Sequence, residues 1–204
     1  MGIKWKVCGL RDNILEVASL KPDFVGFIFY PKSPRYVGVS FEMPDFDGLI
    51  KKVGVFVNES EDFVYSTMQQ CKLDYAQLHG QESPDFCEEL KRKGIKIIKA
   101  FQIGERFSFK KLDPYESVTD YFLFDAKTEK YGGSGKTFDW QELKHYDLNK
   151  EYFLSGGIDL ENIDEFYDID LSKVYALDVN SKFEIKPGLK DIEMLKKLKL
   201  KLNG

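Results

Sequence analysis

Short apolar runs alternate with charged stretches along the whole chain, and this alternation constrains the fold more than any other feature. The runs are Lys4–Cys8, Phe24–Tyr30, Lys52–Val57, Tyr75–Leu78, Ile95–Phe101, Tyr121–Asp125, Tyr152–Leu154 and Val174–Val179. Near-continuous apolar runs are typical of strands that are buried on both faces, as in parallel sheets. Helix-like stretches lie between them, at Glu61–Cys71, Ser83–Lys93, Leu160–Tyr167 and Asp191–Leu200. The pattern predicts an α/β protein with eight parallel strands.

The number of strands favours a single (β/α)8 TIM barrel over an open, doubly wound sheet. An open sheet of the flavodoxin type needs only about five strands, so it would leave several runs unexplained. No Ser-, Gly- or Pro-rich linker divides the 204 residues, which predicts one catalytic domain over residues 1–204. Barrels of this kind typically have about 250 residues. Some helices must therefore be short, and the stretch after Asp139-Trp140 is a candidate.

Composition excludes several classes of function. The chain has 30 Lys and Arg against 34 Asp and Glu, a net charge of −4, so no basic face for nucleic acid is expected. No apolar run approaches the roughly 18 residues that a membrane helix needs, and the N-terminus lacks the apolar stretch of a signal peptide. Three cysteines without a Cys-x-x-Cys pair predict neither a disulfide framework nor a zinc site. We expect a cytoplasmic protein with no metal, no nucleic-acid partner and no membrane partner.

Polar residues gather at the ends of the predicted strands. In a (β/α)8 barrel, active-site residues lie at the carboxyl ends of the strands and in the loops that follow. The residues at these positions are Cys8, Arg35, His79, Asp125 and Asp178, with Gly156-Gly157 and Asn180-Ser181 in two turns. One thiol, one arginine, one histidine and two carboxylates are therefore expected at one rim. Cys71 and Cys87 lie inside predicted helices and are expected in the core.

Taken in order, the strand ends are similar to those of the phosphoribosylanthranilate isomerase family of tryptophan biosynthesis. The matching segments include Lys6-Val7-Cys8-Gly9-Leu10, Ser33-Pro34-Arg35-Tyr36, Gln77-Leu78-His79-Gly80, Gly132-Gly133-Ser134-Gly135-Lys136, Leu154-Ser155-Gly156-Gly157 and Asp178-Val179-Asn180-Ser181. The resemblance implies an Amadori rearrangement, in which N-(5-phosphoribosyl)anthranilate, an aldose derivative, becomes the ketose 1-(2-carboxyphenylamino)-1-deoxyribulose 5-phosphate. It also implies that no metal or organic cofactor takes part.

The resemblance assigns the chemistry to three side chains. Cys8 would be the general base that removes the proton from sugar carbon C2, and Asp125 the general acid that protonates the ring oxygen. Arg35 would hold the anthranilate carboxylate, since a guanidinium fork matches a planar carboxylate. Without the resemblance, each residue also has a plainer interpretation. A buried cysteine is common in cores, an aspartate often caps a loop, and an arginine in a loop is often solvated.

Other residues would bind the rest of a phosphosugar substrate. His79 and Asp178 would contact the substrate near the sugar. Gly156, Gly157, Asn180 and Ser181 would hold the phosphate on backbone amides, the last two by opening a short extra helix. The chain departs from the family after Ser181, where Lys182-Phe183-Glu184 replaces an expected small residue. We expect either a monomer or a homodimer.

Three alternatives stay open on the sequence alone. Gly135-Lys136-Thr137 is similar to the end of a phosphate-binding P-loop, but the glycine that this motif needs five residues before Gly135 is Lys130. A loop that closes over the substrate is the preferred interpretation. Another phosphosugar barrel enzyme is a second alternative, either the aminoaldose isomerase of histidine synthesis or an indole-forming synthase. However, the first strand ends in Cys8 rather than in aspartate or lysine. The third is a phosphosugar-binding module without catalysis.

Overall fold

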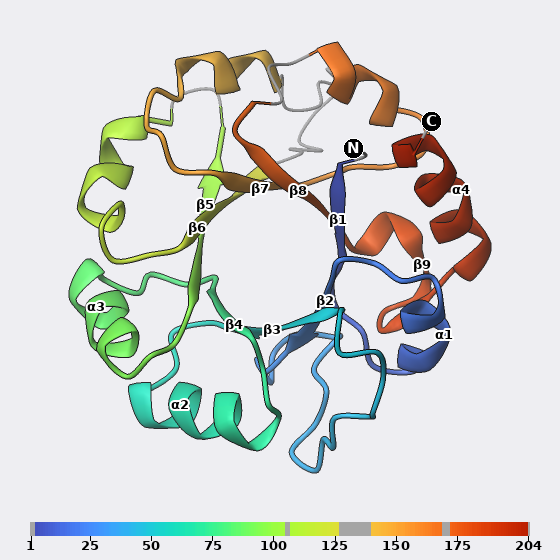
Figure 1. The fold of residues 1–204 in the computed structure, drawn as a ribbon, viewed down its shortest axis with the longest axis horizontal. Coiled ribbons are helices and arrows are strands. Elements are labelled where there is room, and N and C mark those ends of the chain that lie inside the picture. The colour runs from blue at the N-terminus through green and yellow to red at the C-terminus, as the bar shows by residue number, and fades with distance from the viewer. Residues whose placement is uncertain (1–2, 105–106, 127–139, 169–171, 204) are drawn as a thin grey trace.

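Eight parallel strands close into a barrel in the computed structural model, which describes residues 3–104, 107–126, 140–168 and 172–203 (Figure 1). The strands are β1 (Lys4–Val7), β2 (Phe24–Ile28), β3 (Lys51–Phe56), β4 (Tyr75–Leu78), β5 (Ile97–Ile103), β6 (Tyr121–Ala126), β7 (Tyr152–Ser155) and β8 (Val174–Val179). They follow chain order around the barrel, and β8 closes it by pairing with β1. The predicted (β/α)8 fold is confirmed, and no strand boundary differs from its prediction by more than two residues.

Helices surround the barrel, and several are short (Figure 1). The α-helices are α1 (Ile14–Ser19), α2 (Glu61–Gln70), α3 (Pro84–Arg92) and α4 (Ile192–Asn203), and the longer 3-10 helices are η1 (Phe109–Tyr115), η2 (Trp140–His145) and η3 (Ile163–Asp168). Ser83 accepts a hydrogen bond from the Phe86 amide and Pro84 opens α3, as the sequence predicts. In η1, Pro114 removes an amide that an α-helix would need.

Because the helices outside the barrel are short or missing, 204 residues are enough to complete it. The stretch after Trp140 is the predicted short helix, and the helix-like segment 160–167 contains only the 3-10 helix η3. Residues 29–50 connect β2 to β3 without a helix. None of the helices in the described part of the chain is long and apolar enough to cross a membrane.

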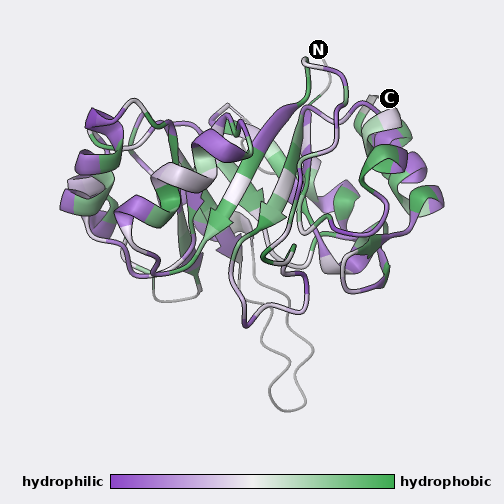
Figure 2. Cartoon of the chain, turned by 90° about the horizontal axis from the view of Figure 1, so that it is seen from below, coloured by the Kyte–Doolittle hydropathy of each residue, from purple (hydrophilic) through white to green (hydrophobic). Residues whose placement is uncertain are grey.

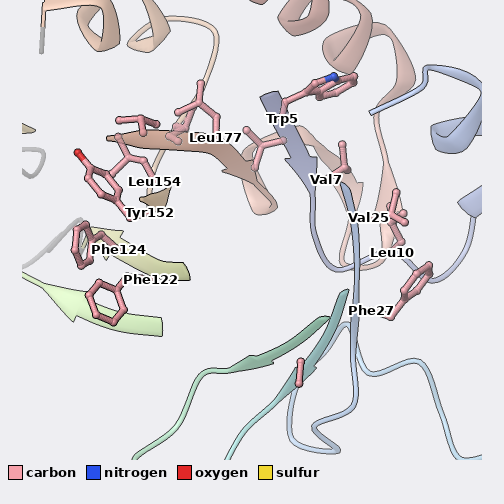
Figure 3. Close-up of a cluster of buried hydrophobic side chains, with 14 of the residues drawn as sticks. Trp5, Val7, Leu10, Val25, Phe27, Phe122, Phe124, Tyr152, Leu154 and Leu177 are labelled. Carbon is pink, nitrogen blue, oxygen red and sulfur yellow. The ribbon is translucent and has the colours of Figure 1, made fainter. Parts of the chain in front are cut away.

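Two apolar layers stabilise the barrel, one outside the strands and one inside. Figure 3 shows outward-facing side chains such as Val7, Phe124 and Leu177, which point from the strands toward the surrounding helices. Hydrophilic residues cover much of the outer surface of those helices (Figure 2). The inner layer consists of Phe24, Val53, Tyr75, Ile98, Ala100, Leu123, Phe153 and Ala176. These side chains fill the interior of the barrel as a packed core. Full burial of a side chain the size of Phe stabilises the fold by about 1.5–3 kcal/mol.

A polar layer lies inside the barrel, toward the carboxyl ends of the strands. Lys6 of β1, Gln77 of β4 and Asp178 of β8 are all buried. The register of the strands brings them together, since Lys6 pairs with Asp178 across the closing seam. Two of the three, Gln77 and Asp178, line the cavity that opens at this end.

Candidate active site

A cavity of about 460 Å³ opens at the carboxyl end of the barrel. It is lined by residues at the ends of every strand except β5. All the site residues predicted from the sequence line it, namely Cys8, Arg35, His79, Asp125, Gly156, Gly157, Asp178, Asn180 and Ser181. These residues therefore lie together at the carboxyl end of the barrel, and their roles stay a prediction.

Cys8 lies directly after β1 and is 5% exposed. It fits there because Gly26 of β2 has no side chain. A Cβ at Gly26 would lie 2.8 Å from Cys8 Sγ and 3.1 Å from its Cα. Burial raises the pKa of the Cys8 thiol, although the nearby ammonium groups of Lys6 and Lys190 act to lower it. The thiol therefore keeps its proton at neutral pH in the absence of a ligand.

Replacing Gly26 by alanine is expected to displace Cys8 and to lower kcat by about 10²-fold, the loss that a 1 Å misplacement of a reacting group can cause. The new methyl group meets backbone as well as the sulfur, so the contact cannot be relieved by rotating one side chain. Steady-state kinetics checks this. Gly48→Ala is the matched control, because a Cβ at Gly48 meets nothing within 4 Å. An unchanged kcat in Gly26→Ala would mean that the position of Cys8 does not matter.

A chain of close polar contacts runs across the cavity from β8 to β6. Lys6 Nζ donates to Asp178 Oδ2 and to Gln77 Oε1, both at 2.6 Å. Gln77 Nε2 lies 2.9 Å from His79 Nδ1, and His79 Nε2 lies 3.4 Å from Asp125 Oδ2. Burial acts to lower the pKa of Lys6, but the charge and hydrogen bond of Asp178 and the proximity of Cys8 together outweigh it, and the pKa is raised. Lys6 therefore stays an ammonium ion.

The two carboxylates of the site differ in exposure. The side chain of Asp125 is 30% exposed and that of Asp178 is 5% exposed. Strand register aligns Asp125 with Ser155, and Ser155 with Asp178, so the two acids flank one residue of β7. Asp178 Oδ1 is buried and has no hydrogen-bond partner among the described residues. A buried oxygen without a partner costs about 1–3 kcal/mol, so this atom is available to a ligand that can donate a hydrogen bond.

Arg35 approaches the cavity from the loop after β2 and is held by Glu184. Its Nε lies 2.9 Å from both carboxylate oxygens of Glu184, and its Nη2 donates to Oε2 at 2.6 Å. Glu184 also accepts a hydrogen bond from Lys190 at 2.8 Å. Burial acts to raise the pKa of Glu184, but the hydrogen bonds from Arg35 and Lys190 lower it overall. Arg35 Nη1 has no partner in the part of the chain that the structure describes, so one edge of the guanidinium is open.

Another part of the cavity is lined by backbone after β7 and β8. Gly156 and Gly157 have φ angles of +100° and +68°, in the left-handed region that favours glycine. Their amides make no hydrogen bond to another described residue. The extra helix predicted at Asn180-Ser181 is only the single 3-10 turn η4 (Ser181–Phe183). The Asn180 side chain does not cap it, because it accepts a hydrogen bond from Lys190 at 2.8 Å. Lys182 lines the cavity, 3.8 Å from Asp159.

Sequence reasoning missed the buried polar residues that support this site. Lys6 lies two residues before Cys8 on the same strand, so alternation along β1 puts both on one face; a lysine inside an apolar run was the signal. Gln77 belonged to a motif of which only His79 was singled out. Glu184 was noted only as a departure after Ser181. The predicted core cysteines Cys71 and Cys87 are buried, as expected. The Gly132–Lys136 loop, with its P-loop and closure interpretations, lies outside the described residues.

Comparisons with known proteins agree with this geometry. Residues 5–200 match the family model described as N-(5'phosphoribosyl)anthranilate (PRA) isomerase. The N-(5'-phosphoribosyl)anthranilate isomerase of Parabacteroides distasonis is 46% identical over 94% of this chain and 89% of that protein. A crystal structure of monomers of the dimeric Thermotoga maritima enzyme superposes with a TM-score of 0.81, 28% identity and 99% coverage of each chain. A phosphoribosylanthranilate isomerase in complex with reduced 1-(o-carboxyphenylamino)-1-deoxyribulose 5-phosphate gives a TM-score of 0.78 at 32% identity, covering 96% and 95% of the chains.

These similarities extend over nearly the whole chain and place the barrel among the aldose–ketose isomerases. The resemblance predicted from the strand ends is confirmed. The chain belongs to the N-(5'-phosphoribosyl)anthranilate isomerase family, whose activity is a step of tryptophan biosynthesis.

Proposed function

We propose that this chain isomerises N-(5-phosphoribosyl)anthranilate with Asp125 as general acid and Cys8 as general base. One observation carries the assignment of roles: the thiol and the carboxylate line the same cavity. That cavity also presents an unengaged guanidinium edge and two glycine amides, which suit the two anionic ends of the substrate. A single bound molecule can therefore meet acid, base and both anion sites together.

In the proposed mechanism, the Asp125 carboxyl group first protonates the furanose ring oxygen. The C1–O bond breaks, and the nitrogen lone pair forms an iminium ion at C1. The Cys8 thiolate then removes the C2 proton, and the electrons of the C–H bond neutralise the iminium to give an enolamine. This product tautomerises to the ketone. The positive iminium beside Cys8 favours loss of the thiol proton to solvent, which forms the thiolate before the C2 proton is taken and offsets the burial that raises the thiol pKa.

Asp178 is proposed to accept a hydrogen bond from the sugar part of the substrate. Its Oδ2 is already engaged by Lys6, while its buried Oδ1 has no partner among the described residues. A sugar hydroxyl or the substrate amine would satisfy Oδ1 and relieve the cost of leaving it unpaired. This contact would also fix the position of the sugar relative to the polar layer of the barrel.

The phosphate is proposed to bind at Gly156 and Gly157, with help from Ser181. Consecutive amides in a turn that contains left-handed residues form a concave anion site, and the amides of both glycines make no hydrogen bond to another described residue. Lys182 lines the same part of the cavity and brings a positive charge to it. The ammonium group of Lys182 therefore adds to the amides of Gly156 and Gly157 and to the short helix expected at Asn180-Ser181.

Arg35→Lys is expected to raise the KM by about 10- to 100-fold, because a hydrogen bond to a charged group contributes about 1.5–3 kcal/mol. Lysine cannot keep the bidentate contact with Glu184 while presenting a second edge to the anthranilate carboxylate. We expect kcat to change little, since this contact is present in ground and transition states alike. Steady-state kinetics tests this, with Arg92→Lys on the exposed face of α3 as the control. A normal KM would place the anthranilate elsewhere.

Turnover of the freshly prepared aminosugar phosphate tests the function itself, followed by the loss of its anthranilate fluorescence. We expect conversion of this substrate without added metal or cofactor. We expect no turnover of the aminoaldose substrate of histidine synthesis and no turnover of the substrate of the indole-forming synthase. Tight binding of the substrate without turnover would instead support a phosphosugar-binding module. A cytoplasmic location stays a prediction, as does the choice between monomer and homodimer, although a relative is described as dimeric.

A further inference from the structure

The buried contact between Lys6 and Gln77 fixes the orientation of the Gln77 amide. An ammonium group has three donors and no acceptor, and Lys6 Nζ lies 2.6 Å from one polar atom of Gln77. That atom must therefore be the oxygen Oε1. The NH₂ group then faces the other way, where it lies 2.9 Å from His79 Nδ1. Gln77 is 1% exposed, so water does not compete for either contact.

The orientation of Gln77 in turn fixes the tautomer of His79. The amide nitrogen of Gln77 can only donate, so His79 Nδ1 must accept with its lone pair. A neutral imidazole has one N–H, which is then on Nε2. Nε2 faces Asp125 Oδ2 at 3.4 Å, a separation that can shorten when a ligand binds. Every donor in the series therefore points the same way, from Lys6 through Gln77 and His79 to Asp125.

We infer that Gln77 is a positioning residue, which holds His79 as its Nε2–H tautomer and so keeps the acidic proton of Asp125 on Oδ1, the oxygen that is not paired with His79. This inference rests on the proposed role of Asp125 as general acid. An N–H directed at Oδ2 occupies one of the lone pairs of that oxygen, so the proton is favoured on Oδ1. In the other tautomer, a bare Nε2 would draw a proton on Oδ2 toward His79, and the substrate ring oxygen could not receive it.

Gln77→Glu reverses the direction of the hydrogen bond between residue 77 and His79 with little change in the size or shape of the side chain. A carboxylate only accepts, so it would keep the contact with Lys6 but require an N–H on His79 Nδ1. His79 would then present either a bare Nε2, which takes the proton from Asp125, or a full positive charge, which holds Asp125 ionised. We expect kcat to fall by about 10²-fold, within the roughly 10⁴-fold that a wrong histidine tautomer costs in serine proteases, while KM changes little. Gln70→Glu, the same substitution at an exposed position that ends α2, is the matched control and should keep full activity.

Nitrogen-15 NMR of labelled histidine tests the inference directly, because the chain has only two histidines. His145 is exposed, and His145→Gln leaves His79 as the single imidazole. In that background, we expect the chemical shifts of a protonated Nε2 and a bare Nδ1, and in Gln77→Glu a protonated Nδ1. Should Gln77→Glu fail to fold, the parent spectrum alone decides. A proton on Nδ1 in the parent, or a tautomer unchanged by Gln77→Glu, would overturn the inference.

The acid role of Asp125 is separated from this result by Asp125→Asn. If Asp125→Asn is active while the spectrum shows the Nε2–H tautomer, the acid assignment fails and the tautomer assignment stands. If Asp125→Asn is inactive while the spectrum shows Nδ1–H, the acid stands and Gln77 is not its positioning residue.

Discussion

Cys8→Ala is expected to lower kcat by about 10²–10⁴-fold, the usual contribution of a general base. The substitution removes the only group proposed to take the C2 proton and leaves the cavity otherwise unchanged. Rapid kinetics on the fluorescent substrate measures the loss. Cys87→Ala is the matched control, since Cys87 is also buried but lies in α3, outside the cavity. A Cys8→Ala enzyme with kcat within a factor of a few of the parent would exclude the thiol as base.

The dependence of kcat/KM on pH gives the same prediction a second readout. A thiol is a base only as the thiolate, and burial raises the pKa of Cys8 above its ordinary range of about 8.5. A group with a raised pKa is deprotonated only above that pKa, so kcat/KM is expected to keep rising with pH through and beyond the usual thiol range. The rising limb should be absent from the residual activity of Cys8→Ala. A limb that ends well below the usual range, or that persists in the variant, would point to another base.

Asp125→Asn is expected to lower kcat by about 10²–10⁴-fold as well, because an amide cannot donate a proton to the ring oxygen. Asparagine has nearly the same shape, so contacts with the sugar should survive and KM should change little. Single-turnover measurements check whether the loss lies in the chemical step. Asp164→Asn, which removes an exposed carboxylate paired with Lys201 on the outer surface, is the control. If Asp125→Asn opens the ring at the parent rate, the acid is another group.

The sequence was sufficient for the barrel because its signals are local and repeated. Each apolar run is buried on both faces, so its composition alone predicts a strand, as at Tyr75–Leu78 and Val174–Val179, where both boundaries are correct. The site residues followed from the same reasoning, since strand ends of a parallel barrel meet at one rim. The helices were less predictable. The segment 160–167 has helical composition, but the structure contains only a six-residue 3-10 helix there.

The pairing of side chains could not be predicted, because it depends on register and on loops distant in sequence. Lys6 and Asp178 are 172 residues apart and meet only when β8 closes against β1. Arg35 and Glu184 are 149 residues apart, and their contact depends on the turn after β8. The residues at the strand ends therefore do not predict the polar layer beneath the cavity, although Lys6 in the first apolar run indicates it.

A crystal structure of this chain with the reduced product analogue, reduced 1-(o-carboxyphenylamino)-1-deoxyribulose 5-phosphate, tests the central claim most directly. We predict that Cys8 Sγ lies against C2 of the ligand and a carboxylate oxygen of Asp125 against its C4 oxygen, each within the roughly 3.5 Å of a reactive contact. The phosphate should lie on the amides of Gly156 and Gly157. A ligand that touches only one of Cys8 and Asp125, or that binds in the reverse direction with its phosphate at Arg35, would contradict the account.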